Sequence, residues 1–337
     1  MTRILVLAFL FFLAEVYLLE TSLNKLYQKD LWTVNFKNDS QRRVFKIMQN
    51  IHRASVPSVF VFGGSASREF FTPDSNMTKT LGIPFYNCAV SSESAYDSLK
   101  LQTLVKPNSI IIYGLHPKSF YDHSFDYKQV TEGHYFGGAY YKYPLVSDYL
   151  NAHVNADANN SVSTLHRLSP ILNTYIYLLK EYIKNHSFTY ITSSNLPNKK
   201  EPRQYRYIIK PMNTQKLHQK LKKYFQKSIP HMQENLKLNF FLLENMAQLA
   251  IDKNNKFILF ELPFSPIVQK KFNPYLPAYR QALDNLLKKY PNIIFIPNST
   301  LPPAKQQLFF DTIHLLPAGR DYYYKATAKS LKQVIQP

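Results

Sequence analysis

The sequence contains a single cysteine, Cys88, and only 22 acidic residues against 41 lysines and arginines. One cysteine excludes an intramolecular disulfide, a CxxC redox pair and a multi-cysteine zinc knuckle, and we expect Cys88 to be a small buried apolar residue. The glycine-rich nucleotide loops GxGxxG and GxxxxGK[ST], internal repeats and zinc-finger or RNP-type signatures are also missing. We therefore expect no cofactor, no metal site and no nucleic-acid partner.

The shortage of acidic residues leaves a formal net charge of +19. Such an excess favours anionic partners such as phospholipid headgroups or an acidic polymer. Hydrophobic residues make up 45% of the 337 residues, enough apolar surface for a folded body of one large or two small domains. We expect the basic residues at 199–227 and 288–289 to lie on solvated helix and loop faces, where they can also contact anionic lipid.

The N-terminus carries an apolar run, Ile4–Ala14, behind a single basic residue, Arg3. This layout is typical of a signal peptide or signal anchor, and no small-x-small cleavage site follows the run. Sixteen residues, Ile4–Leu19, span about 24 Å as a helix, slightly less than the ~30 Å hydrocarbon core. We expect a membrane helix at 1–20 and a stem at 21–39, with the rest of the chain exported; a buried N-terminal helix is the alternative.

The remainder, 40–337, alternates short apolar runs with segments of helical period, which predicts a three-layer α/β domain with a mainly parallel, five-stranded sheet. A polar, tyrosine-rich stretch at about 116–211 interrupts the pattern and is expected to be an insertion, partly helical at 168–183. The strands are expected at 58–62, 83–90, 109–113, 256–262 and 292–296, and the helices at 40–54, 95–105, 213–226, 232–252, 275–290 and 318–334.

Ligands of open α/β sheets bind beyond the carboxyl ends of the strands, and the first expected strand is followed there by Gly63, Gly64 and Ser65. Two glycines allow a tight turn that leaves the hydroxyl of Ser65 available at a strand-to-helix junction. Taken alone, this segment is better explained as a glycine-rich turn with an N-cap serine. Arg68, three residues on, is a candidate ligand for an anionic substrate group, or else a solvated charge.

The second candidate segment is Asp311-Thr312-Ile313-His314, placed before the last expected helix. An Asp three residues before a His can bind one imidazole nitrogen, and the other nitrogen can then activate a serine hydroxyl. A lone DxxH pattern also fits a turn-capping Asp followed by a surface His.

Together the two segments resemble the first and last blocks, GDS and DxxHLxxxG, of the SGNH (GDSL-like) hydrolase superfamily. The matching positions are Ser65 as nucleophile, His314 as base and Asp311 as the acid that orients it, with Gly64 where the family usually has Asp. The resemblance covers about 56–114 and 235–335. It implies an SGNH-type fold and an acyl-serine intermediate.

The middle blocks of the family resemble this chain less closely. The family has an Asn followed five residues later by a Gly whose N–H helps to bind the oxyanion; here Asn87 is kept and Ser92 replaces the Gly. The Asn of the family's GxND block is replaced by His116. The resemblance implies an oxyanion site made by the backbone N–H groups of Ser65 and Ser92 with His116, and loss of one such donor costs about 10²- to 10³-fold in rate.

Among SGNH proteins, an anchor combined with a nonstandard GxS block is similar to membrane-associated proteins of cell-envelope acylation, such as the alginate O-acetylation proteins and the D-alanyl transfer protein DltD. That resemblance implies a single-pass protein of the bacterial inner membrane facing the periplasm. It also implies an O-acyltransferase or esterase acting on an envelope polysaccharide or other acylated polymer, with a membrane-bound O-acyltransferase as a partner. Two alternatives remain open: a noncatalytic, anchored glycan-binding scaffold with a degenerate site, and a secreted lipase or esterase.

Overall fold

A computed structural model of the chain describes residues 43, 47–48, 50–90, 95–121 and 211–336. The chain divides into two compact units, and all of these residues except Arg43 belong to the unit formed by Lys46–Phe125 and Pro197–Pro337. No helix in the described ranges is long and apolar enough to cross a membrane. The expected membrane helix at 1–20, the stem at 21–39 and most of the expected insertion lie outside the described residues.

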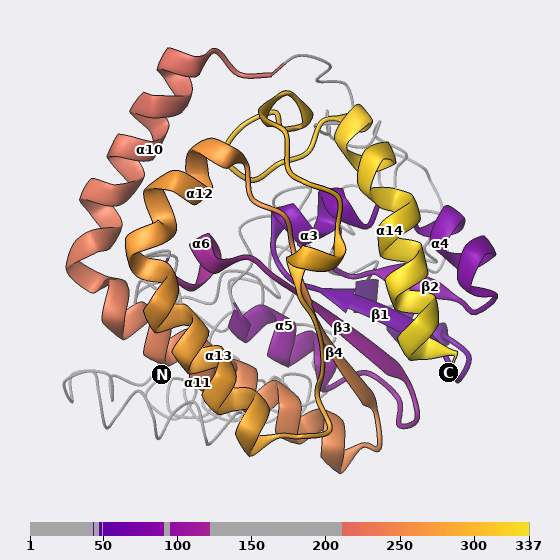
Figure 1. The fold of residues 1–337 in the computed structure, drawn as a ribbon. Coiled ribbons are helices and arrows are strands. Elements are labelled where there is room, and N and C mark those ends of the chain that lie inside the picture. The colour runs from indigo at the N-terminus through magenta and orange to yellow at the C-terminus, as the bar shows by residue number, and fades with distance from the viewer. Residues whose placement is uncertain (1–42, 44–46, 49, 91–94, 122–210, 337) are drawn as a thin grey trace, which may run out of the picture. The chain divides into compact units, whose positions relative to one another are not determined.

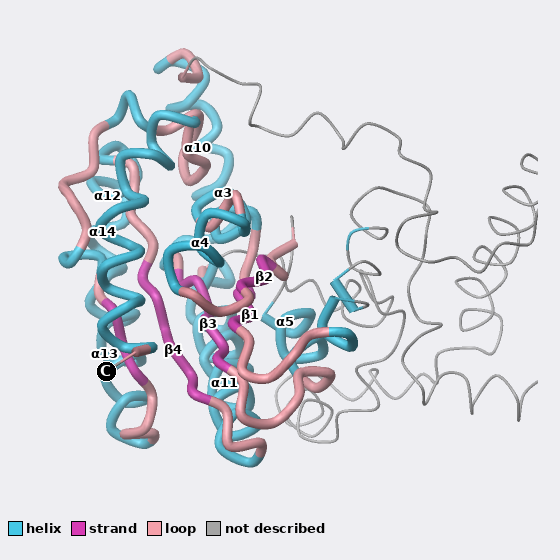
Figure 2. Tube along the Cα trace, turned by 90° about the vertical axis from the view of Figure 1, so that its right-hand side faces the viewer, coloured by secondary structure: helices cyan, strands magenta, loops and turns pink. Residues whose placement is uncertain are grey.

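The unit is built on one sheet of five strands, all parallel, in the order β2-β1-β3-β4-β5. Figure 2 shows β1, β3 and β4 lying side by side. Every residue of β1 and β3 is buried, as expected for strands covered on both faces. The strands are β1 (Val59–Phe62), β2 (Phe85–Asn87), β3 (Ile110–Leu115), β4 (Lys256–Glu261) and β5 (Ile294–Ile296).

Helices lie on both faces of the sheet (Figure 1). Alternate strand side chains point to opposite faces. Val59 and Val61 belong to a core shared with Phe70 and Tyr323, which come from the helices of one face. That face is covered by α3 (Ser65–Phe70), α4 (Asp74–Leu81) and α14 (Pro317–Ile335), and the other by α5 (Ala95–Gln102), α11 (Met232–Asp252) and α13 (Leu276–Lys289).

Three further helices follow strand ends or precede α11. They are α6 (Pro117–Phe120) directly after β3, α10 (Thr214–Ser228) before α11, and α12 (Pro266–Phe272) after β4. Asn213 caps α10, because its side chain accepts a hydrogen bond from the backbone N–H of Gln215. Leu217 and Leu221, four residues apart, are buried and fix which side of α10 faces the protein.

The parallel α/β class and all five strands expected from the sequence are confirmed, and the helices expected at 213–226, 232–252, 275–290 and 318–334 are found within two residues of those bounds. The strand expected at 83–90 is shorter, Phe85–Asn87, although the backbone N–H groups of Cys88 and Val90 still donate to Val61 and Gly63 at 2.8 and 3.1 Å. The strand expected to stop before Gly114 continues to Leu115, since its partner β4 pairs with it to the end. Helices α4 and α12 were not expected.

Candidate active site

Ser65 is the first residue of α3, and the sharp connection from β1 to this helix sets its position. Gly63 has φ +125°, in the region that favours glycine, and a Cβ there would also overlap the Ser67 hydroxyl. The helix begins at once, with the Arg68 backbone N–H donating to the Gly64 carbonyl at 3.1 Å. The Ser65 side chain therefore stands, partly exposed, beyond the carboxyl end of the first strand.

Asp311 and His314 lie in a tight loop that leads into α14. The loop is closed by an antiparallel bridge between Phe309 and Leu315 and by a hydrogen bond of 2.8 Å from the Phe310 N–H to the His314 carbonyl. Inside it, one oxygen of Asp311, Oδ1, accepts hydrogen bonds from the backbone N–H groups of Ile313 and His314, both at 3.0 Å. An aspartate that binds the backbone two and three residues ahead holds such a turn in one conformation.

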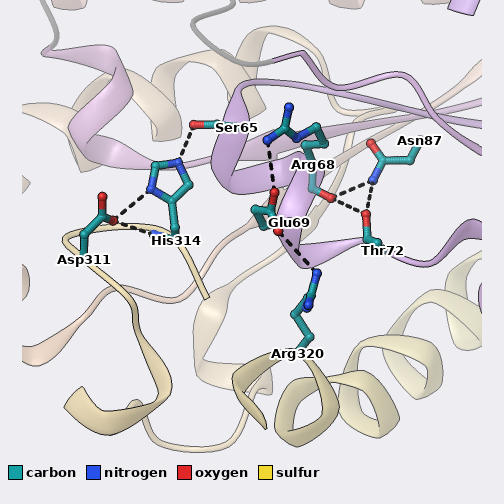
Figure 3. Close-up of polar contacts among 8 residues, drawn as sticks. All are labelled: Ser65, Arg68, Glu69, Thr72, Asn87, Asp311, His314 and Arg320. Atoms are coloured by element: carbon teal, nitrogen blue, oxygen red, sulfur yellow. Dashed lines mark hydrogen bonds and ion pairs between the residues drawn. The ribbon is translucent and has the colours of Figure 1, made fainter. Parts of the chain in front are cut away.

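The structure brings Ser65, His314 and Asp311 together in one hydrogen-bonded row (Figure 3). The Nε2 atom of His314 lies 2.7 Å from the Ser65 hydroxyl, across a separation of 249 residues, and its Nδ1 lies 2.9 Å from Oδ1 of Asp311. Because an ionised carboxylate only accepts hydrogen bonds, Nδ1 carries the proton, and Nε2 accepts from the serine hydroxyl. This is the arrangement required for general-base activation of a serine.

The neighbours of Asp311 keep its carboxyl group ionised although the side chain is almost fully buried. Burial alone raises the pKa of this carboxyl, but hydrogen bonds and charge from His314 and from Lys220 outweigh it and hold the pKa well below its usual range. The Lys220 ammonium, on α10, lies 2.5 Å from Oδ2. Asp311 is therefore ionised at any pH near neutrality, ready to support a proton on the adjacent imidazole.

His116 lies at the carboxyl end of β3, next to the turn that carries Ser65. The register pairs Phe62 with Tyr113, so the residues following the two strands run side by side. The ring is 2% exposed and packs on Phe264, with centroids 4.7 Å apart, and neither ring nitrogen has a hydrogen-bond partner among the described residues. Burial lowers the pKa of His116 to about 3, with the charges of Lys118 and His314 acting in the same direction, so the ring is neutral at physiological pH.

Of the two residues expected from the family's second block, Asn87 lies in the described part of the chain and Ser92 does not. The Asn87 amide donates to the Arg68 carbonyl at 2.9 Å and, more weakly, to the Thr72 hydroxyl at 3.4 Å. Its backbone N–H donates to Asp74 at 2.9 Å. These contacts tie β2 to the end of α3, so Asn87 supports the position of the helix that carries Ser65.

Arg68 is neither a solvated charge nor an unpaired one. Its side chain is 13% exposed and lies 3.1 Å from Glu69, whose second oxygen lies 3.3 Å from Arg320 at the start of α14 (Figure 3). One buried carboxylate thus joins two guanidinium groups and links α3 to α14. The expected role of Arg68 as an anion ligand remains a prediction.

Lys220 is half-exposed, as expected of a lysine on a solvated face, but sequence reasoning missed that its ammonium also contacts the buried Asp311. The helical period of α10 was visible, but only the packing of the helix decides which lysine reaches this carboxylate. Cys88 is buried, as expected. No group of three or more His, Cys, Asp or Glu side chains within the described ranges is arranged to hold a metal ion.

Comparisons with known proteins give no relative on which to base a function. No protein-family model matches the sequence, and no curated protein matches it significantly. The function is therefore inferred from the sequence and from the geometry of the site.

Proposed function

We propose that this chain is a serine-dependent acyltransferase or esterase of the SGNH type, acting on a cell-envelope glycan or other acylated polymer. The observation that carries the proposal is the pair of hydrogen bonds that join Ser65 to His314 and His314 to Asp311, at 2.7 and 2.9 Å. Further support comes from the parallel α/β fold, with Ser65 after the first strand and the other two residues just before the last helix. The basic composition and the apolar N-terminal run support an anionic, membrane-proximal setting.

In the proposed reaction, the oxygen of Ser65 attacks the carbonyl carbon of an ester or thioester. The hydroxyl proton passes to Nε2 of His314, and Asp311 stabilises the imidazolium that forms. When the tetrahedral intermediate collapses, His314 returns that proton to the leaving alkoxide or thiolate, and an acyl-serine remains. A glycan hydroxyl or water then attacks the acyl group, again losing its proton to His314, and Ser65 recovers its proton as the product leaves.

Charge on the carbonyl oxygen requires donors, and His116 supports this part of the proposal. A neutral imidazole has one N–H, and His116, whose ring nitrogens have no hydrogen-bond partner in the described part of the chain, follows the strand that pairs with the one leading to Ser65. The backbone N–H groups of Ser65 and Ser92 are the other donors that we propose. Each donor of this kind contributes about 10²- to 10³-fold in rate.

Labelling with a fluorophosphonate probe tests the proposal. We expect the folded full-length protein to form one adduct, located on Ser65 by peptide mass spectrometry, because the probe reacts with serines activated by a neighbouring base. Ser65→Ala should abolish labelling and His314→Ala should lower its rate by at least about 10³-fold, since the general base is lost. Ser75→Ala, which changes an exposed serine on the neighbouring helix α4, is the matched control and should still be labelled at Ser65.

An unlabelled wild-type protein would contradict the enzyme proposal. If the same protein bound an acidic polysaccharide, and if Ser65→Ala and His314→Ala left that binding unchanged, the noncatalytic scaffold would be favoured. Release of acetate or another acyl group from the polymer, abolished by both changes, would identify the enzyme and its acyl group together.

A further inference from the structure

The carboxylate of Asp311 divides its hydrogen bonds unequally between its two oxygens. Oδ1 accepts from the Nδ1 atom of His314 and from two backbone N–H groups in the loop. Oδ2 has a single partner in the described structure, the ammonium of Lys220. The Asp311 side chain is 1% exposed, and Lys220, which is about half-exposed, lies between it and solvent. Without this lysine, Oδ2 would have no partner among the described residues.

Lys220 is presented to Asp311 by a helix that is fixed on both sides of the site. The backbone N–H of Met212, just before α10, donates to the carbonyl of Phe310, the residue before Asp311, at 2.7 Å. About one turn after Lys220, the Tyr224 hydroxyl donates to the Lys118 carbonyl at 3.0 Å, and the Lys118 ammonium lies 3.9 Å from the centre of the Tyr224 ring. The helix therefore contacts both the Asp311 loop and the segment after His116.

We propose that Lys220 is a positioning residue of this site: its bond to Oδ2 fixes the rotation of the Asp311 carboxylate, and it holds a positive charge at the carboxylate oxygen that does not bind His314. The inference rests on the proposed function and names a residue that tunes it. By holding Oδ2, Lys220 keeps Oδ1 directed at the imidazole. Its ammonium also contributes a positive charge next to the site, which a neutral side chain at this position would remove.

Other ionisable groups also surround the imidazole, and the test must separate Lys220 from them. His116, which is neutral, and Lys118 follow β3 directly in the chain. On α3 and α14, the charges of Arg68, Glu69 and Arg320 compensate one another in part. Besides His314, Lys220 is the one ionisable side chain in the described structure that bonds directly to Asp311.

The experiment is the rate of fluorophosphonate labelling of full-length protein measured from about pH 5 to about pH 9. For Lys220→Met we expect the plateau rate to fall about tenfold, because the carboxylate loses its second anchor. We also expect the midpoint on the acid side to rise by about half a unit to one unit, since a half-exposed positive charge is removed. Lys220→Arg, which keeps the charge, should restore the wild-type midpoint. Lys223→Met is the matched control, an exposed lysine of the same helix, and should follow the wild-type profile.

A purely structural role would lower the fraction of protein that reacts and leave the midpoint unchanged in every variant. Wild-type rate and midpoint in Lys220→Met would overturn the inference. Should that variant fail to fold by circular dichroism, Lys220→Gln, which keeps a donor without the charge, replaces it and should still raise the midpoint.

Failure of the proposed function is distinguishable, because it leaves wild-type Ser65 unlabelled. In that case the ring titration of His314 is followed directly by NMR on histidine-labelled protein, with His314→Gln used for assignment. A midpoint that is higher in the Lys220 variant supports the inference, and an unchanged midpoint overturns it.

Discussion

At the scale of the residue, His116 is the side chain whose burial has the clearest energetic cost. Its two ring nitrogens lack partners among the described residues, and a buried, unpaired polar group costs about 1–3 kcal/mol. A site that keeps such a group places it where a ligand can satisfy it, which is the role proposed here for the oxyanion. The same burial makes the protein sensitive to acid.

We predict that His116 makes the protein lose stability between about pH 6.5 and pH 3. The pKa is lowered from 6.5 to about 3 in the folded state, so on acidification the unfolded chain binds the proton first. The free energy of unfolding is therefore undiminished above pH 6.5 and falls as the pH drops through this window, by up to about 4 kcal/mol from this group. Urea unfolding of the wild type at a series of pH values measures the loss.

His116→Phe keeps a ring against Phe264 without a titrating group, and it should remove most of that dependence. The difference between the two proteins isolates the histidine, because Asp311 and the other acids are present in both. Equal slopes for wild type and variant would show that the ring is not buried as described. In labelling, His116→Asn should retain more activity than His116→Phe, because only the asparagine offers an N–H.

At the scale of the element, the position of Ser65 depends on how closely α3 packs on β3. The Ser67 hydroxyl donates to the Gly114 carbonyl at 3.2 Å, and a Cβ on Gly114 would overlap the Ser67 side chain. We predict that Gly114→Ala lowers the free energy of unfolding by about 1–3 kcal/mol and displaces α3. Labelling of Ser65 should fall with it, since a shift of about 1 Å is enough to break the bond to His314.

Gly64→Ala is the control, because no heavy atom outside its chain neighbours lies within 4 Å of the added Cβ. The φ of Gly64 is −75°, which alanine also adopts, so the expected cost is under about 1 kcal/mol. Urea unfolding of both variants beside the wild type compares the two glycines. Equal losses at both positions would contradict the close packing of α3 on β3.

The same elements explain what could be predicted from the sequence. Fully buried strands give unbroken apolar runs, such as Val59–Phe62, and long amphipathic helices give a regular period, so both were found. Short helices such as α4 and α12 carry too few turns for a period to be read. Ser65 and the Asp311–His314 pair could be proposed from their places in the chain, because parallel strands end at one edge. Lys220 could not be proposed in this way, because nothing in the sequence distinguishes it from the other lysines of α10.

At the scale of the whole molecule, the apolar N-terminal run predicts a membrane helix at 1–20. We predict that the full-length protein stays with membranes after extraction in high salt and in alkaline carbonate, because a helix inserted in the bilayer is released by neither. A chain held only by its net charge of +19 would leave with salt, since screening weakens contacts with anionic headgroups.

The matched variant carries Leu10→Lys and Leu13→Lys inside the apolar run. Each lysine near the middle of a membrane helix costs about 2.5–3.5 kcal/mol in insertion, so this protein should appear in the soluble fraction. Retention of both proteins after carbonate would place the membrane attachment elsewhere in the chain.

The pairing of β3 with β4 also decides the order in which the proposed site can be assembled during synthesis. These neighbouring strands are separated by about 140 positions, and Asp311 and His314 come later still in the chain. While a ribosome is making the intervening residues, the serine at the start of α3 stands without its two partners. Under the proposed function, the emerging polypeptide would carry an unactivated hydroxyl until the loop before α14 has been made and lies against Ser65.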